Sequence, residues 1–161
     1  MSRPNKMMST PALTLVEDKM ENEVGKTAVL IVDDQEDLRY TLRLMLEGLS
    51  SDYLLLEAER AEQAFEMIRR FRPRLVLMDV SMPGIGGVEA TRMIKAEFDR
   101  TVIIGLSLHE REDMESAMRE AGAAHYLTKD ADPEVILDVI EKCLQDAEFP
   151  VRPTIRQDKR D

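Results

Sequence analysis

The sequence predicts an α/β fold built on a five-stranded parallel sheet with helices on both faces. Two observations predict this fold: five short apolar runs have the composition of buried strands, and each is followed by a stretch whose apolar residues recur at helical spacing. Strands that alternate with helices pair in parallel, because each helix carries the chain back to the start of the next strand. A chain of 161 residues has room for one such domain and two short tails.

The first two strands and helices occupy the stretch up to residue 71. Ala28–Val32 is an apolar, mostly β-branched run that predicts the first strand, and residues 36–48 repeat apolar side chains at helical spacing. The run "YLLLEA" predicts the second strand at residues 53–58. Residues 61–71 predict the second helix, because their alanine, phenylalanine and isoleucine side chains fall on one helical face.

The remaining strands and helices follow in the same order. The run "RLVLMD" predicts a third strand, "MPGIGG" ends it, and residues 88–98 predict a helix. The run "TVIIGLS" predicts a fourth strand, before a helix that ends at Gly122. The short run "HYLTK" predicts the fifth strand, and Asp132-Pro133 supplies the N-cap and first-turn proline of the last helix.

Polar side chains stand where four of the five predicted strands end. They are Asp33, Asp34, Asp79, Ser107 and Lys129. Right-handed crossovers bring these strand ends to one edge of the sheet, which is where ligands of such folds bind. Three carboxylates at one edge repel one another unless a cation lies between them, and Mg²⁺ prefers oxygen ligands. The pattern therefore predicts a divalent-cation site beside a hydroxyl and an ammonium group.

Each of these residues also has a purely structural interpretation. Asp33 or Asp34 is a suitable helix N-cap, and Asp79 is suited to begin a turn. Ser107 is compatible with a simple strand end, and Lys129 with a surface ion pair of little energetic weight. These interpretations do not explain why all five residues stand at the same end of successive strands.

Four segments resemble the receiver domain of two-component response regulators: "VLIVDDQEDLR", "LVLMDVSMPGIGGVEATRMIK", "GLS" and "AGAAHYLTKDA". The resemblance covers about residues 27–147, and the acidic pair, the aspartate, the serine and the lysine occur in the family's order. It implies a flavodoxin-like, doubly wound (βα)5 fold with strand order 2-1-3-4-5. The "KDA" segment resembles receivers that are linked to helix-turn-helix outputs.

The resemblance implies that Asp79 is the phosphoacceptor, which takes a phosphoryl group from a sensor histidine kinase or phosphotransfer protein. It implies that Asp34 and Asp79 bind Mg²⁺ directly, with the backbone carbonyl of Ser81 beside them. Asp33 would act mainly through water, and Mn²⁺ would be a possible substitute for Mg²⁺. The chain would then be a regulatory domain that assists its own phosphorylation and autodephosphorylation, rather than an enzyme.

The resemblance also implies how the signal is transmitted. Lys129 would pair with the phosphoryl oxygens, Ser107 would hydrogen-bond to one of them, and Tyr126 would change rotamer with the state of Ser107. The surface formed by the fourth helix, fifth strand and fifth helix would then repack. We expect this surface to bind a downstream protein, to form a self-dimer or to control an output domain.

Composition narrows the partners and the compartment. The net charge is −10, and the acidic excess lies between residues 28 and 148, so this segment is not expected to bind nucleic acid directly. No apolar run reaches the roughly 20 residues of a membrane span, so no membrane association is expected. The single cysteine, Cys143, falls on an apolar helical face, which favours a reducing, cytoplasmic compartment.

The structure of the two ends of the chain stays open. Residues 1–26 predict a disordered extension or a short amphipathic helix, and residues 148–161 predict a tail or linker, with a stand-alone receiver slightly favoured over a fragment that lacks its output domain. The main alternative to a phosphoacceptor switch is a non-phosphorylated receiver-like interaction module, although none of the five site residues is missing. An aspartate-nucleophile phosphatase would need an Asp where Ser81 stands, and a flavin protein would need a phosphate loop after the first strand.

Overall fold

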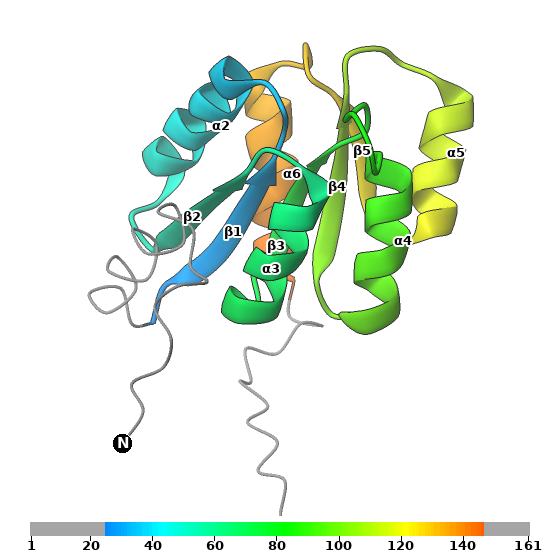
Figure 1. Ribbon diagram of the computed structural model, residues 1–161. Helices are drawn as coiled ribbons and strands as arrows, with labels where there is room; N and C mark the ends of the chain where they lie inside the picture. Colours follow the sequence, from blue (N-terminus) through cyan, green and yellow to red (C-terminus); the bar gives the residue numbers. More distant parts are fainter. Residues whose placement is uncertain (1–24, 147–161) are drawn as a thin grey trace, which may run out of the picture.

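The computed structural model contains one parallel sheet whose strands lie in the order β2-β1-β3-β4-β5 (Figure 1). The structure describes residues 25–146. The strands are β1 (Thr27–Val32), β2 (Tyr53–Ala58), β3 (Leu75–Asp79), β4 (Val102–Ser107) and β5 (His125–Thr128). This is the predicted order, and the fold is flavodoxin-like. Because β1 lies between β2 and β3, the strand order reverses there, and the strand ends beside β1 and β3 form the expected ligand-binding edge.

Five helices cover the two faces of the sheet (Figure 1). They are α2 (Glu36–Leu49), α3 (Ala61–Phe71), α4 (Gly87–Glu97), α5 (Glu112–Ala121) and α6 (Pro133–Gln145). Leu30 and Val32 of β1 belong to the apolar cluster that contains side chains of α3, α4 and α5. Val29 and Ile31 belong to the cluster that contains side chains of α2 and α6. Successive residues of one strand thus bury opposite faces, as a parallel sheet covered on both sides requires.

The start of α6 and the end of α5 have the capping residues that the sequence predicts, whereas the end of α3 does not have a glycine. The Asp132 side chain accepts a hydrogen bond of 2.9 Å from the backbone N–H of Glu134, with Pro133 in the first turn of α6. Gly122 ends α5 with φ of 112°, which glycine adopts without a Cβ clash. Arg72 ends α3 in the same left-handed region, and its guanidinium lies 4.4 Å from the centroid of the Phe98 ring. That stacking contact joins α3 to the end of α4.

The predicted bounds of β2 and α3 match the structure, and those of the other strands and of α2 and α4 differ by one residue. For example, β3 and β4 begin at Leu75 and Val102, one residue later than predicted. Cys143 is buried on α6, as its place in the apolar pattern predicts. The expected leader helix and the expected tail fall in residues 1–24 and 147–161, outside the described residues. Within residues 25–146 the structure has no helix with the length and apolar character that a bilayer crossing requires.

Candidate functional site

Three aspartates meet at the carboxyl ends of β1 and β3. Asp33 and Asp34 directly follow β1, and Asp79 is the last residue of β3. One carboxylate oxygen from each residue lies within 4.8 Å of the others. Asp33 and Asp79 are only 1% and 2% exposed, whereas Asp34 is exposed to solvent. The site therefore combines two buried acids with one that solvent and ions can reach.

Lys129 places its ammonium group among the buried carboxylates. It follows β5 directly, and its Nζ lies 2.8 Å from Asp33 Oδ2 and 3.1 Å from Asp79 Oδ1. Burial by itself lowers the pKa of Lys129, but the hydrogen bonds and charges of Asp33 and Asp79 outweigh burial, so the pKa lies above its ordinary value. Lys129 is therefore held in its charged form, bridging the strands that carry the two buried acids.

One ammonium group does not neutralise three carboxylates. Burial raises the pKa of Asp79, and the Asp33 carboxylate raises it further, to about 6, against the opposing effects of the Lys129 ammonium and the Ser81 amide. A second cation would favour the ionised form of Asp79. A dication matches the excess negative charge, and three carboxylate oxygens so close together are a suitable donor set for Mg²⁺. The residues at this edge of the sheet therefore fit the predicted metal.

The loop after β3 is held against Asp79 by backbone contacts. The backbone N–H of Ser81 donates a hydrogen bond of 3.1 Å to Asp79 Oδ1, which orients the carboxylate. Gly87 begins α4 so close to β3 that a Cβ there would lie 2.3 Å from the Asp79 carbonyl oxygen and 2.7 Å from Val80 Cα. Sequence reasoning did not single out Gly87. The Gly-Gly pair was the available signal, since such a close backbone approach leaves no room for a side chain.

Ser107 and Tyr126 share a hydrogen-bond acceptor. Ser107 ends β4 and is 5% exposed, and its Oγ donates to the carbonyl oxygen of His109 at 3.1 Å. The Tyr126 hydroxyl, on β5, donates to the same carbonyl at 3.3 Å. The two residues predicted to act together are thus connected through the β4–α5 loop. The sequence does not reveal this link, because the shared acceptor is a backbone group.

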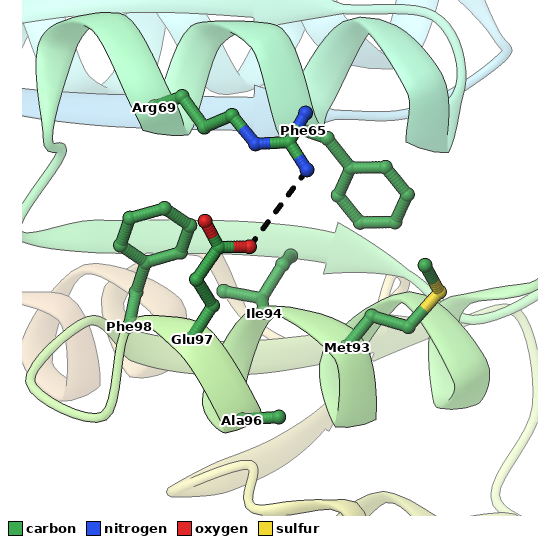
Figure 2. Close-up of a pocket in the computed structure, with 7 residues that line it drawn as sticks. All are labelled: Phe65, Arg69, Met93, Ile94, Ala96, Glu97 and Phe98. Atoms are coloured by element: carbon green, nitrogen blue, oxygen red, sulfur yellow. Dashed lines mark ion pairs between the residues drawn. The ribbon is translucent and has the colours of Figure 1, made fainter.

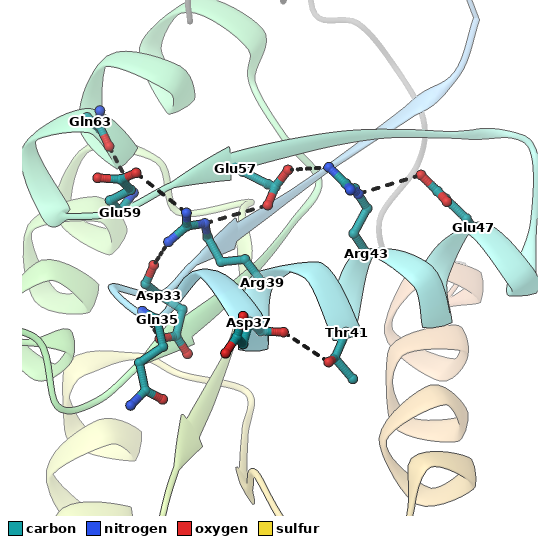
Figure 3. Close-up of polar contacts among 10 residues, drawn as sticks. All are labelled: Asp33, Gln35, Asp37, Arg39, Thr41, Arg43, Glu47, Glu57, Glu59 and Gln63. Carbon is teal, nitrogen blue, oxygen red and sulfur yellow. Dashed lines mark hydrogen bonds and ion pairs between the residues drawn. The ribbon is translucent and has the colours of Figure 1, made fainter.

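Arg39 is a further buried charge that sequence reasoning missed. It lies on α2 with 7% exposure, and its guanidinium contacts the backbone carbonyl of Asp33 and the carboxylates of Glu57 and Glu59 (Figure 3). Its sequence signal was weak, since an arginine in an amphipathic helix is usually on the solvent side. Arg39 is thus connected through Asp33 to Lys129 and Asp79.

The surface also has a hollow that does not include the acidic cluster. It has a volume of about 390 Å³ between α3 and α4, and the Arg69–Glu97 ion pair of 3.7 Å crosses it (Figure 2). It is lined by Phe65, Arg69, Met93, Ile94, Ala96, Glu97 and Phe98. None of these residues belongs to the acidic cluster, so the candidate site is identified by its charges rather than by a deep cavity.

Comparisons with known proteins agree on one family. The family model of the response regulator receiver domain matches residues 29–141. Response regulator UvrY from Escherichia coli K12 is 40% identical over 112 residues, which are 70% of this chain and 51% of UvrY. Response regulator GacA from Pseudomonas aeruginosa is 33% identical over 130 residues, which are 80% of this chain and 60% of GacA. The chain therefore spans about half the length of the curated relatives it matches.

Solved structures give the same result. A two-component response regulator of the LuxR family from Aurantimonas sp. SI85-9A1 aligns with a TM-score of 0.70 and 32% identity, covering 74% of this chain and 85% of that protein. The chemotaxis protein CheY4 from Vibrio cholerae aligns with a TM-score of 0.68 and 22% identity, covering 73% of this chain and 98% of CheY4. Because the identity with CheY4 is only 22%, this likeness shows the fold alone.

Proposed function

Because the chain belongs to the family of response regulator receiver domains, we propose that it is a phosphoacceptor switch in which Asp79 takes up a phosphoryl group. Phosphorylation and Mg²⁺ binding are typical of this family, whose members interact with histidine kinases. One observation carries the assignment to this chain. One carboxylate oxygen each of Asp33, Asp34 and Asp79 lies within 4.8 Å of the others, and Lys129 is paired with Asp79. The expected donor is a sensor histidine kinase or a phosphotransfer protein.

Asp34 and Asp79 would hold the metal directly, the backbone carbonyl of Ser81 would be a further ligand, and Asp33 would act mainly through water. A bound Mg²⁺, or Mn²⁺ in its place, supplies positive charge that offsets the negative charge of the phosphoryl oxygens. The protein supplies the rest of the electrostatics. Lys129, held charged by its neighbours, lies 3.1 Å from Asp79 Oδ1 and is close enough to pair with a phosphoryl group on the other oxygen of the same carboxylate.

The reaction forms one bond and breaks one bond. An oxygen of the ionised Asp79 attacks phosphorus, the P–N bond of the donor phosphohistidine breaks, and the donor imidazole keeps the electron pair and takes a proton from solvent. The Ser81 N–H, which donates to Asp79 Oδ1, leaves the other carboxylate oxygen to attack. The product is an acyl phosphate, whose lability makes the modification a timed signal. The chain would also assist the later hydrolysis of this acyl phosphate, which is its autodephosphorylation.

Signal transmission would begin at Ser107. To donate to a phosphoryl oxygen, the Ser107 hydroxyl has to release the carbonyl of His109, to which Tyr126 also donates. The β4–α5 loop and Tyr126 then rearrange together, and the surface of α5, β5 and α6 changes shape. This surface would act on a downstream protein, a second copy of the chain or an output domain, since the matched segment is only 51% of the relative UvrY.

The first experiment measures intact-protein mass after incubation with acetyl phosphate and Mg²⁺. We expect a gain of one phosphoryl group that requires Mg²⁺ and disappears in Asp79→Asn. The control is Asp37→Asn, which changes an exposed aspartate in the first turn of α2 and should keep the gain. A folded wild-type protein that gains no mass under these conditions would favour the alternative, a receiver-like interaction module that is not phosphorylated.

A further inference from the structure

Arg39 is buried in a way that requires a specific reason. Its side chain is 8% exposed, and a guanidinium removed from water is costly unless its donors are satisfied. Glu57 and Glu59 at the end of β2 offer the obvious explanation, an ion pair between α2 and the sheet (Figure 3). However, both carboxylates lie 3.5 Å from the guanidinium nitrogens, and their side chains are 31% and 58% exposed. Such partly solvated pairs contribute little.

The shortest contact of Arg39 is with the backbone. Its Nη1 donates a hydrogen bond of 2.6 Å to the carbonyl oxygen of Asp33, and this bond is buried. A charge-assisted hydrogen bond to a carbonyl is strong when water is excluded. Arg39 therefore lies closer to the peptide that follows β1 than to either of its acidic partners.

Every polar group of Asp33 has a partner. Its N–H donates to the Ala58 carbonyl at 3.1 Å, and its carbonyl accepts from Arg39. Its Oδ1 accepts from the Gln35 N–H at 2.9 Å, and its Oδ2 pairs with Lys129 at 2.8 Å. By contrast, among residues 25–146 the structure records no hydrogen bond or ion pair to the side chain of Asp34, which is exposed.

The carbonyl of Asp33 and the N–H of Asp34 belong to one rigid peptide unit. A hydrogen bond that fixes the direction of that carbonyl therefore fixes the peptide plane, and with it the position of the Asp34 Cα atom that carries the side chain. This inference rests on the proposed function, in which Asp34 is a direct metal ligand. We propose that Arg39 is a positioning residue for the divalent-cation site, which holds the Asp33–Asp34 peptide so that the otherwise unheld Asp34 carboxylate is aligned with Asp79.

Arg43 provides a matched control one helical turn further along α2. It shares Glu57 with Arg39, at 3.1 Å, and its Nε lies 3.8 Å from Glu47 (Figure 3). It makes no recorded contact with Asp33 in the described part of the chain. Replacing either arginine by methionine removes one positive charge and one partner of Glu57. Only the Arg39 change removes the hydrogen bond to the Asp33 carbonyl.

Electrostatics and positioning predict opposite signs for Arg39→Met. Loss of a positive charge near three carboxylates strengthens cation binding by Coulomb attraction alone. Loss of the hydrogen bond to the Asp33 carbonyl weakens cation binding, because Asp34 then has to be ordered when the ion arrives. A weaker affinity in Arg39→Met, together with an equal or stronger affinity in Arg43→Met, can therefore be attributed to positioning.

The experiment is an NMR titration of the metal-free proteins with Mg²⁺, following the amide signals of Asp34 and Gln35. We expect Arg39→Met to raise the Mg²⁺ dissociation constant by about tenfold, the lower end of the range for residues that orient metal ligands. Arg39→Lys should raise it by about threefold, because an ammonium group lacks the planar fork that reaches the carbonyl and the glutamates together. Arg43→Met and Arg43→Lys should not raise it.

Amide hydrogen exchange supplies a second readout without metal. The Gln35 N–H, bonded to Asp33 Oδ1, should exchange faster in both Arg39 variants and at the wild-type rate in both Arg43 variants. If Arg39→Met does not fold, the two lysine variants decide, since equal Mg²⁺ affinity in them would overturn the proposal. Unchanged Mg²⁺ affinity in folded Arg39→Met would also overturn it. A wild-type protein that does not bind Mg²⁺ would overturn the proposed function as well, so the two failures are distinguishable.

Discussion

Replacing Asp79 by asparagine should stabilise the metal-free protein at neutral pH and have little effect in acid. The ordinary pKa of an aspartate is 3.8, and burial together with the Asp33 carboxylate raises the pKa of Asp79 to about 6 in the folded chain. Between these values the folded chain retains a proton that the unfolded chain has released. Ionising Asp79 as the pH rises through this range therefore costs the folded state stability.

The size of the effect follows from the two pKa values. A difference of about two pH units corresponds to about 3 kcal/mol, since each unit is worth about 1.4 kcal/mol. Asparagine has nearly the same shape and no charge, so it avoids this cost. We expect the stability gained by Asp79→Asn to be small near pH 4 and to increase by about 2–3 kcal/mol by pH 7, because the aspartate of the unfolded chain is already partly ionised at pH 4 and the pKa of about 6 already includes the attraction of Lys129.

The assay is urea denaturation between pH 4 and pH 7 in the presence of EDTA, followed by circular dichroism because the chain has no tryptophan. The quantity compared is the free energy of unfolding of Asp79→Asn minus that of the wild type, so other titrating groups largely cancel. Asp37→Asn, at an exposed position, should show no such trend. A difference that stays constant with pH, or a loss of stability in Asp79→Asn at pH 7, would refute the reasoning.

Two further predictions concern the metal and the loop after β3. At a free concentration about 100 times its dissociation constant, Mg²⁺ should raise the free energy of unfolding of the wild type by about 2.7 kcal/mol, an effect that EDTA reverses. The double variant Asp33→Ala with Asp34→Ala should not respond, and tight Mg²⁺ binding by it would contradict the metal assignment. Gly87→Ala should lower the free energy of unfolding by about 1–3 kcal/mol, because the new methyl group meets backbone atoms of β3 and Val80. Gly48→Ala, within α2 and with nothing in contact range, should instead be neutral or stabilising, and equal losses in both variants would count against the clash.

The fold was predictable because its signals are local and repeat along the chain. Each buried strand is an apolar run, and each helix has an apolar stripe, so the alternation alone predicts a parallel sheet with two covered faces. The helix ends at Asp132 and Gly122 were predictable from capping chemistry. The left-handed end of α3 at Arg72 was not, because its stacking partner, Phe98, is distant in sequence.

The site was predictable only as far as topology brings strand ends together. That rule places Asp33, Asp34, Asp79 and Lys129 at one edge, and the structure places them there, although their individual roles stay predictions. The rule says nothing about groups that act through the backbone. The contact of Arg39 with the Asp33 carbonyl is a feature of this kind, since carbonyl oxygens carry no sequence signal.

The adjacency of the two aspartates after β1 has a physical explanation in this arrangement. A single carboxylate cannot be both buried against Lys129 and accessible to an ion from solvent. Asp33 takes the first position, with 1% exposure and a partner for every polar group, and Asp34 takes the second. Because they share a peptide bond, the contacts that fix Asp33 also limit where Asp34 can point. Under the proposed function, Asp34 would therefore be an accessible metal ligand whose position is already limited, and no second carboxylate is buried beside Asp79, whose pKa is already raised by burial and by Asp33.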